Sequence, residues 1–196
     1  MWSSAVRVAM TSPDLPSGSD RVQAALAALD PGQRFTRVVN LQGDIPAISP
    51  DDIRGVAALL DSGGESFDIA TLGAWTESAA ELADPAVVKM AAEPLAAPAG
   101  AVRALWFSRA TLPHGARRAI HHVGIYAYRR SALERFVRLP PAAVEQAERL
   151  EQLRALAAGM RMVAGIIPET PVGVDTESHI PAAEAQLSRL PARRDR

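Results

Sequence analysis

The sequence has 196 residues, of which 48% are hydrophobic and 22% are charged, and its formal net charge is -1 at pH 7. These values are typical of one globular domain with a sizeable core, and the near-neutral charge argues against a nucleic-acid or membrane partner. The sequence has no cysteine, which excludes disulfides, thiolate metal sites and cysteine nucleophiles. It contains neither an apolar run of roughly 20 residues nor a signal-peptide pattern, so we expect a cytoplasmic protein.

Strand-like and helix-like segments alternate along the chain, which predicts a layered α/β fold. The strand-like segments are short and apolar, and lie at 6–10, 35–41, 67–72, 86–90, 104–108, 123–128 and 162–167. We expect 35–41 to be a buried parallel strand and 86–90 to pair with 104–108. The segment 91–100 is rich in alanine and proline and is predicted to be a surface loop.

Apolar residues at helical spacing predict the helices. The predicted helical segments are 21–29, 50–60, 131–137, 144–160 and 182–190. The clearest start is Ser49-Pro50-Asp51-Asp52, where a capping serine precedes proline and two acids that face the helix dipole. The segment 144–160 is predicted to be one continuous helix with a leucine stripe. Pro181 is expected to delay the last helix until about residue 182, and 192–196 to be a frayed basic end.

Two aspartates stand where they would meet a ligand. Asp44 follows the predicted strand 35–41, and ligands of doubly wound α/β folds bind at the carboxyl ends of strands. Gly43 would let a ligand or a metal approach the backbone. Asp175 lies in Gly173-Val174-Asp175-Thr176, just before the last helix. Each aspartate also fits a capping role. Together they would suit one Mg²⁺, which takes one or two carboxylates plus substrate phosphates.

Seven short motifs follow one another along the chain. They are Ser17-Gly18-Ser19-Asp20-Arg21, Leu41-Gln42-Gly43-Asp44-Ile45-Pro46, Val88-Lys89, Phe107-Ser108-Arg109-Ala110, His122-Val123-Gly124-Ile125-Tyr126-Ala127-Tyr128, Leu150-Glu151-Gln152-Leu153-Arg154 and Gly173-Val174-Asp175-Thr176. Over about residues 5 to 190, their order and spacing resemble the CMP-Kdo synthetase family of sugar-activating cytidylyltransferases. The resemblance implies a single domain over 1–196, with a nucleotide-diphospho-sugar-transferase-like, Rossmann-type three-layer α/β/α sandwich. It also implies a sugar-binding and dimerisation region at 86–128.

The resemblance further implies a reaction and a site. The reaction is transfer of CMP from CTP to the anomeric hydroxyl of 3-deoxy-D-manno-octulosonate (Kdo), giving CMP-Kdo and pyrophosphate for lipopolysaccharide biosynthesis. Asp44 and Asp175 would bind the catalytic Mg²⁺. The positions that would line the Kdo pocket are Gln42, Arg109, His122, Tyr126, Glu151 and Gln152. The positions that would border the nucleotide are Ser17, Gly18, Arg21 and Lys89. The expected partners are CTP, Kdo and a second copy of the chain in a homodimer.

The residue types suit an acidic sugar. Arg109 would offer a planar two-pronged donor to its carboxylate. His122 and Tyr126 are four residues apart and would share one face of a strand. Structural roles stay open for each: Tyr126 in the core, Arg109 in a surface ion pair, Glu151 on a solvated helix face, and an ordinary turn capped by Ser19.

One part of the family pattern is missing. The family's opening strand and its basic phosphate-binding loop have no counterpart in this sequence, so we expect a chain that is N-terminally truncated relative to the family. Three functions stay open: a Kdo cytidylyltransferase, a related enzyme for another acidic sugar such as a sialic acid, and a non-catalytic binding or dimerisation module. The spacing His122-x-Gly-x-Tyr126 and the Glu151-Gln152 pair favour the first.

Overall fold

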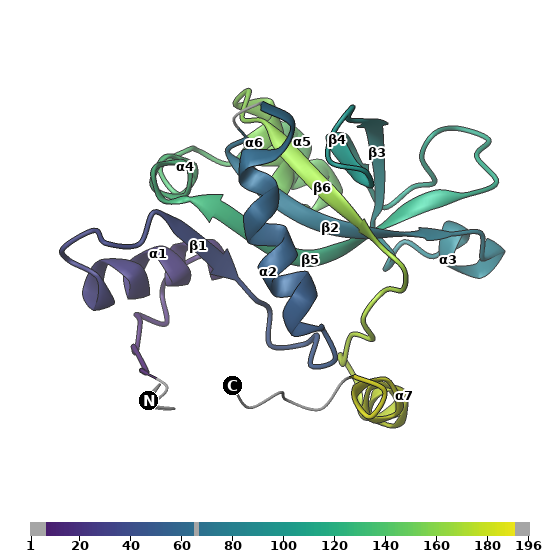
Figure 1. Ribbon diagram of the computed structural model, residues 1–196, viewed down its shortest axis with the longest axis horizontal. Coiled ribbons are helices and arrows are strands. Elements are labelled where there is room, and N and C mark those ends of the chain that lie inside the picture. Colours follow the sequence, from purple (N-terminus) through teal and green to yellow (C-terminus); the bar gives the residue numbers. More distant parts are fainter. Residues whose placement is uncertain (1–6, 65–66, 191–196) are drawn as a thin grey trace.

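In the computed structural model, which describes residues 7–64 and 67–190, six strands form one mixed sheet (Figure 1). The strands are β1 (Arg37–Asn40), β2 (Ile69–Thr76), β3 (Lys89–Pro94), β4 (Ala101–Ser108), β5 (Ala119–Arg129) and β6 (Met162–Ile167). Their order is β1-β5-β2-β6-β4-β3. β2 and β6 are parallel, and the other neighbours are antiparallel. β3 also pairs with β5, so the sheet curls back on itself.

Helices cover both faces of this sheet. They are α1 (Gly18–Leu29), α2 (Pro50–Ala58), α3 (Ala79–Ala83), α4 (Arg130–Phe136), α5 (Ala143–Glu148), α6 (Gln152–Ala157) and α7 (Ile180–Leu187), with short 3₁₀ helices at Leu59–Gly64 and Glu177–His179. α2 crosses the front of the sheet in Figure 1, and α4, α5 and α6 lie behind it. Two separate cores result, because successive strand residues point to opposite faces. Ile69 packs with α4 and α6, whereas Ala70 packs with α2. The predicted three-layer α/β/α sandwich is therefore confirmed.

The segment around β1 differs from its prediction. β1 lies at the edge of the sheet, runs antiparallel to β5 and is mostly half-exposed, so the prediction of a buried parallel strand is wrong. A short apolar run does not distinguish an edge strand from a central one. Residues 7–10 form no strand, and residue 6 of that prediction lies outside the described residues.

The predicted long helix 144–160 is broken in two. Arg149 adopts the left-handed conformation, with φ 55°, between α5 and α6. Tertiary contacts explain the break. The carboxylate of Glu148 accepts hydrogen bonds from Ser108 Oγ (2.7 Å) and Arg109 N (3.0 Å), and its carbonyl accepts one from Arg109 Nε (3.0 Å). These bonds hold the end of α5 and override helix propensity. Leu150 is still buried after the break.

Other boundaries shift by a few residues. Ser49 caps α2 as predicted, and its Oγ accepts from Asp52 N at 3.0 Å. β3 continues to Pro94, into the predicted loop. α7 begins at Ile180 with Pro181 in its first turn, where proline is tolerated. The predicted frayed end at 192–196 lies outside the described residues. None of the helices within 7–64 and 67–190 has the length and apolarity that a membrane span requires.

Candidate active site

The two predicted metal ligands lie on neighbouring loops. Asp44 follows β1, Asp175 precedes α7, and both are exposed. Val174 N donates a hydrogen bond of 2.7 Å to the carbonyl of Asp44, which ties the two loops together. Among the described residues, no group of three or more His, Asp or Glu side chains would bind a metal by itself. The pair fits a Mg²⁺ that completes its coordination with substrate phosphates and water.

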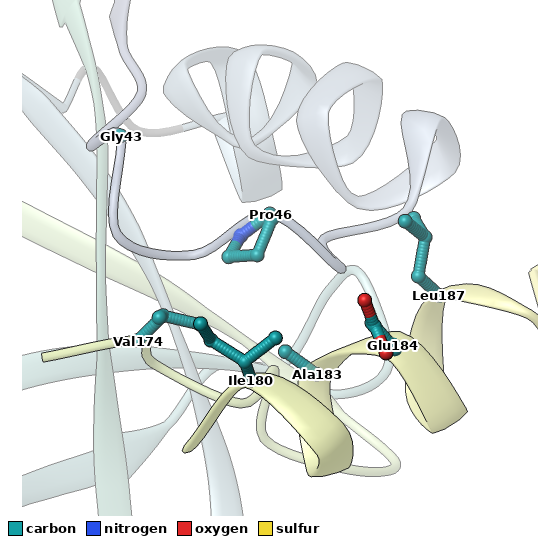
Figure 2. Close-up of a pocket in the computed structure, with 7 residues that line it drawn as sticks. All are labelled: Gly43, Pro46, Val174, Ile180, Ala183, Glu184 and Leu187. Carbon is teal, nitrogen blue, oxygen red and sulfur yellow. The ribbon is translucent and has the colours of Figure 1, made fainter. Parts of the chain in front are cut away.

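A cavity of about 310 Å³ adjoins this pair of loops (Figure 2). It is lined by Gly43, Pro46, Val174, Ile180, Ala183, Glu184 and Leu187. In Figure 2, α7 presents its side chains to the loop that carries Pro46. Gly43 and Val174 are the chain neighbours of Asp44 and Asp175, so the cavity opens beside the predicted metal ligands.

Gln42 links this edge to the predicted nucleotide segment. Its Nε2 donates to Oδ1 of the buried Asn40 at 3.0 Å. A Cβ atom added at Gly18 would lie 3.7 Å from the same Nε2. The end of β1 and the start of α1 therefore meet, and they bring a predicted sugar residue and a predicted nucleotide residue together.

The start of α1 is capped by Ser17 rather than by Ser19. Ser17 Oγ accepts from Asp20 N at 3.2 Å and donates to Asp20 Oδ2 at 2.7 Å. Ser19 lies inside the helix and is buried. The Arg21 guanidinium donates to the carbonyls of the preceding loop, at Ser12, Pro13 and Leu15. In this arrangement Arg21 holds the loop in front of α1.

Glu151 is held by α1. Its Oε2 accepts a hydrogen bond of 3.0 Å from Ser19 Oγ, and its Oε1 is buried without a hydrogen-bond partner among the described residues. The nearest guanidinium atom, Nη2 of Arg154, lies 3.9 Å from Oε1. Glu151 is therefore only partly exposed and binds another helix, rather than lying on a fully solvated helix face. Gln152, the next residue, is also buried. A buried carboxylate oxygen that accepts no hydrogen bond is costly, so it marks a place where a ligand donor would be favourable.

His122 and Tyr126 share one face, and a strand irregularity brings them together. The pairing of β5 with β2 shifts between Thr71 and Leu72: Thr71 lies opposite Tyr126, whereas Leu72 lies opposite Val123. On a regular strand, residues four apart are about 13 Å from each other. Here the ring centroids of His122 and Tyr126 are 5.5 Å apart.

Burial sets the protonation of both rings. Burial and, to a smaller extent, neighbouring His121 together lower the pKa of His122 from 6.5 to about 3, so His122 is neutral near pH 7. Burial also raises the pKa of the Tyr126 hydroxyl well above 10, with Tyr128 and Glu151 adding to the effect. The site thus presents a neutral imidazole and a protonated phenol to a ligand.

Lys89 is saturated by carbonyls. It is the only lysine of the sequence, it is fully buried, and burial lowers its pKa. Its Nζ donates to the carbonyls of Asp84 (2.8 Å), Val87 (2.8 Å) and Arg109 (2.6 Å). An ammonium has three donors, so none is left for a nucleotide in this arrangement. The structure therefore does not support the predicted nucleotide contact and gives Lys89 a structural task.

The Arg109 side chain also donates hydrogen bonds to backbone carbonyls. Its side chain donates to the carbonyls of Pro85 (2.9 Å) and Glu148 (3.0 Å), and more weakly to that of Arg149 (3.5 Å). The open alternative of a surface ion pair does not hold, since these partners are carbonyls. The guanidinium has five N–H donors, so these three contacts leave two of them for another acceptor.

Sequence reasoning missed three residues that build this site. Thr71 contacts His122, Ser19 binds Glu151, and Glu148 holds Arg109. Of these three residues, only Thr71 could have been identified as unusual from the sequence. It is a hydroxyl within the otherwise apolar segment 69–74, and a buried polar group needs a partner. The other two contacts join segments far apart in the sequence, so no local pattern marks them.

Comparison with known proteins identifies the family. The cytidylyltransferase family model matches residues 3–162. A 3-deoxy-manno-octulosonate cytidylyltransferase of Rhodopseudomonas palustris (strain BisA53) is 53% identical over 182 residues, which cover 93% of this chain and 72% of that protein. The same enzyme of Bradyrhizobium sp. (strain ORS 278) is 51% identical, with the same coverage. The chain belongs to the cytidylyltransferase family, and within it to the 3-deoxy-manno-octulosonate cytidylyltransferases.

Solved structures agree with this assignment. A CMP:2-keto-3-deoxy-manno-octonic acid synthetase complexed with CTP superposes with a TM-score of 0.76 at 34% identity, covering 89% of this chain and 69% of that one. A UDP-glucose pyrophosphorylase complexed with UDP-glucose superposes with a TM-score of 0.53 at 15% identity. The second likeness shows the shared fold alone.

Proposed function

We propose that this chain transfers CMP from CTP to the anomeric hydroxyl of Kdo, giving CMP-Kdo and pyrophosphate. The observation that carries the proposal is the identity of 50% or more to 3-deoxy-manno-octulosonate cytidylyltransferases over more than nine-tenths of the chain. In this reaction a bond forms between the sugar oxygen and the α-phosphorus, the bond from that phosphorus to the β-phosphate oxygen breaks, and the hydroxyl proton is released. Such a transfer depends on positioning and on charge stabilisation.

The two aspartates are the proposed Mg²⁺ ligands. Asp44 and Asp175 are oxygen donors on loops that a hydrogen bond joins at Val174, and hard cations prefer such ligands. Bound there, Mg²⁺ would neutralise charge on the phosphates. The aspartates themselves hold an exposed anionic edge beside the cavity at Gly43.

The Kdo pocket is proposed around the buried and partly buried side chains of β5 and the start of α6. Neutral His122 and protonated Tyr126 would bind sugar hydroxyls, and the free Oε1 of Glu151 would accept from another. Gln42 and Gln152 add amide groups, and Arg109 would pair with the sugar carboxylate. On the nucleotide side, the start of α1 at Ser17 and Gly18 would border CTP.

We also propose the setting of the reaction. The product suits lipopolysaccharide biosynthesis in the cytoplasm. A homodimer through residues 86–128 is part of this proposal, and Leu105, which is 47% exposed on β4, would be buried by it. Sedimentation analysis tests the dimer: a species of twice the chain mass is expected, and a monomer at all concentrations would contradict it.

The substrate assignment is tested by product formation. The chain is incubated with Mg²⁺, one nucleotide (CTP or UTP) and one acidic sugar (Kdo or a sialic acid), and the products are identified by mass spectrometry and pyrophosphate release. CMP-Kdo from the CTP and Kdo pair is expected. CMP-sialate instead would support the related cytidylyltransferase. Binding of CTP by calorimetry without any product would support a non-catalytic binding module.

A further inference from the structure

Thr71 lies in the centre of the sheet and makes three contacts through one hydroxyl. It is fully buried on β2. Its Oγ1 lies 3.0 Å from Nε2 of His122, 3.1 Å from the carbonyl oxygen of Val123 and 2.8 Å from that of Ile125. All three partners belong to β5, at the place where its pairing with β2 shifts.

The hydroxyl of Thr71 provides a hydrogen-bonding partner where the pairing of β2 and β5 is irregular. Between Thr71 and Leu72, β5 advances three residues for one on β2, so residues 124 and 125 have no opposite neighbour. Strand irregularities of this kind leave backbone groups unpaired. Of the two carbonyls that Thr71 reaches, that of Val123 lies beside this stretch and that of Ile125 lies within it, and a buried carbonyl needs a donor.

Counting protons favours one histidine tautomer, because the shortest contact of the Thr71 hydroxyl is to the carbonyl of Ile125, at 2.8 Å. A threonine hydroxyl has one proton and two lone pairs. If that proton goes to Ile125 or Val123, the oxygen is left to accept, and His122 must donate from Nε2. In a neutral ring the other nitrogen, Nδ1, then carries a lone pair. Nδ1 makes no hydrogen bond within 7–64 and 67–190 and is not among the buried atoms that lack a partner there, so solvent or a ligand reaches it.

We propose that Thr71 is a positioning residue that holds His122 in the tautomer protonated at Nε2, so that Nδ1 faces the sugar site as an acceptor. The sugar part of this proposal rests on the proposed function. An acceptor at this point selects a sugar with a hydroxyl there and disfavours one with an ether or carbonyl oxygen, because the two lone pairs would face each other. A residue outside the sugar pocket thus sets part of its specificity.

The tautomer is measured directly by NMR of the full chain labelled with ¹⁵N-histidine. Protonated and unprotonated ring nitrogens resonate in separate ranges, and the signals of His122 are assigned by their loss in His122→Asn. We expect Nε2 to be protonated and Nδ1 unprotonated near pH 7. A ring protonated at Nδ1 would overturn the proposal. This readout needs no turnover, so it stands or fails independently of the cytidylyltransferase activity.

Two variants then distinguish a loss of His122 positioning from a general loss of structure. Thr71→Val keeps the shape of the side chain and removes the hydroxyl, and Thr71→Ser keeps the hydroxyl. We expect Thr71→Val to raise the KM for Kdo by about three- to tenfold with kcat nearly unchanged, and Thr71→Ser to restore the KM. A Thr71→Val protein with the wild-type tautomer and KM would overturn the proposal. If that variant does not fold, the wild-type spectrum still decides.

Discussion

The two sides of the site are held in very different ways. Asp44 and Asp175 lie exposed on loops that one backbone hydrogen bond joins. His122 lies on β5 in a buried hydrogen bond with Thr71, and Glu151 lies beside α6 in a partly buried hydrogen bond with Ser19. The difference indicates that the fold organises the sugar pocket in advance, whereas substrate phosphates and a cation would organise the metal side. Changes on the sugar side should therefore affect stability as well as binding, and changes on the metal side should affect turnover alone.

The largest expected effect on stability is at Lys89. Lys89→Met keeps most of the volume of this buried side chain but leaves three partly buried carbonyls without their donor. We expect the free energy of unfolding to fall by about 3 kcal/mol, measured by urea denaturation. The control is Arg54→Met, which removes an exposed cation and should cost less than about 0.5 kcal/mol. Equal losses in the two variants would show that the carbonyl contacts of Lys89 do not matter.

The next effect is a pH dependence of stability. The pKa of His122 is about 3 in the folded chain and about 6.5 in the unfolded chain, so the unfolded state binds the extra proton between these values. Its contribution to stability is full above pH 6.5 and is lost as the pH falls toward 3. Between pH 7 and pH 5 we expect a loss of about 2 kcal/mol.

Urea denaturation at several pH values measures this loss, and the His122→Asn variant should show a correspondingly flatter profile. A wild-type profile as flat as that of His122→Asn over this range would mean that the ring titrates normally in the folded protein.

A smaller effect is expected where α1 meets the sugar pocket. Ser19→Ala removes the hydroxyl that donates to Glu151 Oε2, so that neither carboxylate oxygen then has a hydrogen-bond donor among the described residues. We expect about 1 kcal/mol of lost stability and a KM for Kdo raised several-fold. Ser19→Thr retains the hydroxyl and serves as the matched control. Unchanged kinetics in Ser19→Ala would show that Glu151 needs no support from α1.

The smallest effect on stability is expected on the metal side. Asp44→Asn changes an exposed side chain and leaves the carbonyl that accepts from Val174 in place. Its free energy of unfolding should stay within about 0.5 kcal/mol of wild type, and so should that of Asp51→Asn, a second exposed aspartate. A clear loss in Asp44→Asn alone would mean that the metal side is also built into the fold.

Local sequence patterns predicted what depends on neighbours in the chain. The capped start of α2 and a strand over 123–128 were predicted from such patterns, and that strand extends over Ala119–Arg129 in the structure, so that it also carries His122. The order of short motifs also indicated the family. Patterns failed where distant segments decide the structure. The helix expected over 144–160 breaks at Arg149 because Glu148 binds Ser108 and Arg109.

In the candidate site, too, local patterns predicted what depends on neighbouring residues and missed what depends on distant segments. Strand alternation placed His122 and Tyr126 on one face, but a regular strand does not bring their rings within 5.5 Å. That distance depends on the shifted pairing with β2 at Thr71. Nor does a lysine in sequence reveal that three carbonyls already occupy its ammonium, as they do at Lys89.

The division between the two sides is tested most directly by steady-state kinetics of Asp44→Asn and His122→Asn, measured side by side with CTP, Kdo and Mg²⁺. The account predicts that Asp44→Asn lowers kcat by about 10²- to 10³-fold with a nearly unchanged KM for Kdo. It predicts that His122→Asn raises that KM about tenfold with a smaller change in kcat. An Asp44→Asn enzyme with wild-type kcat, or a His122→Asn enzyme with wild-type KM, would contradict it.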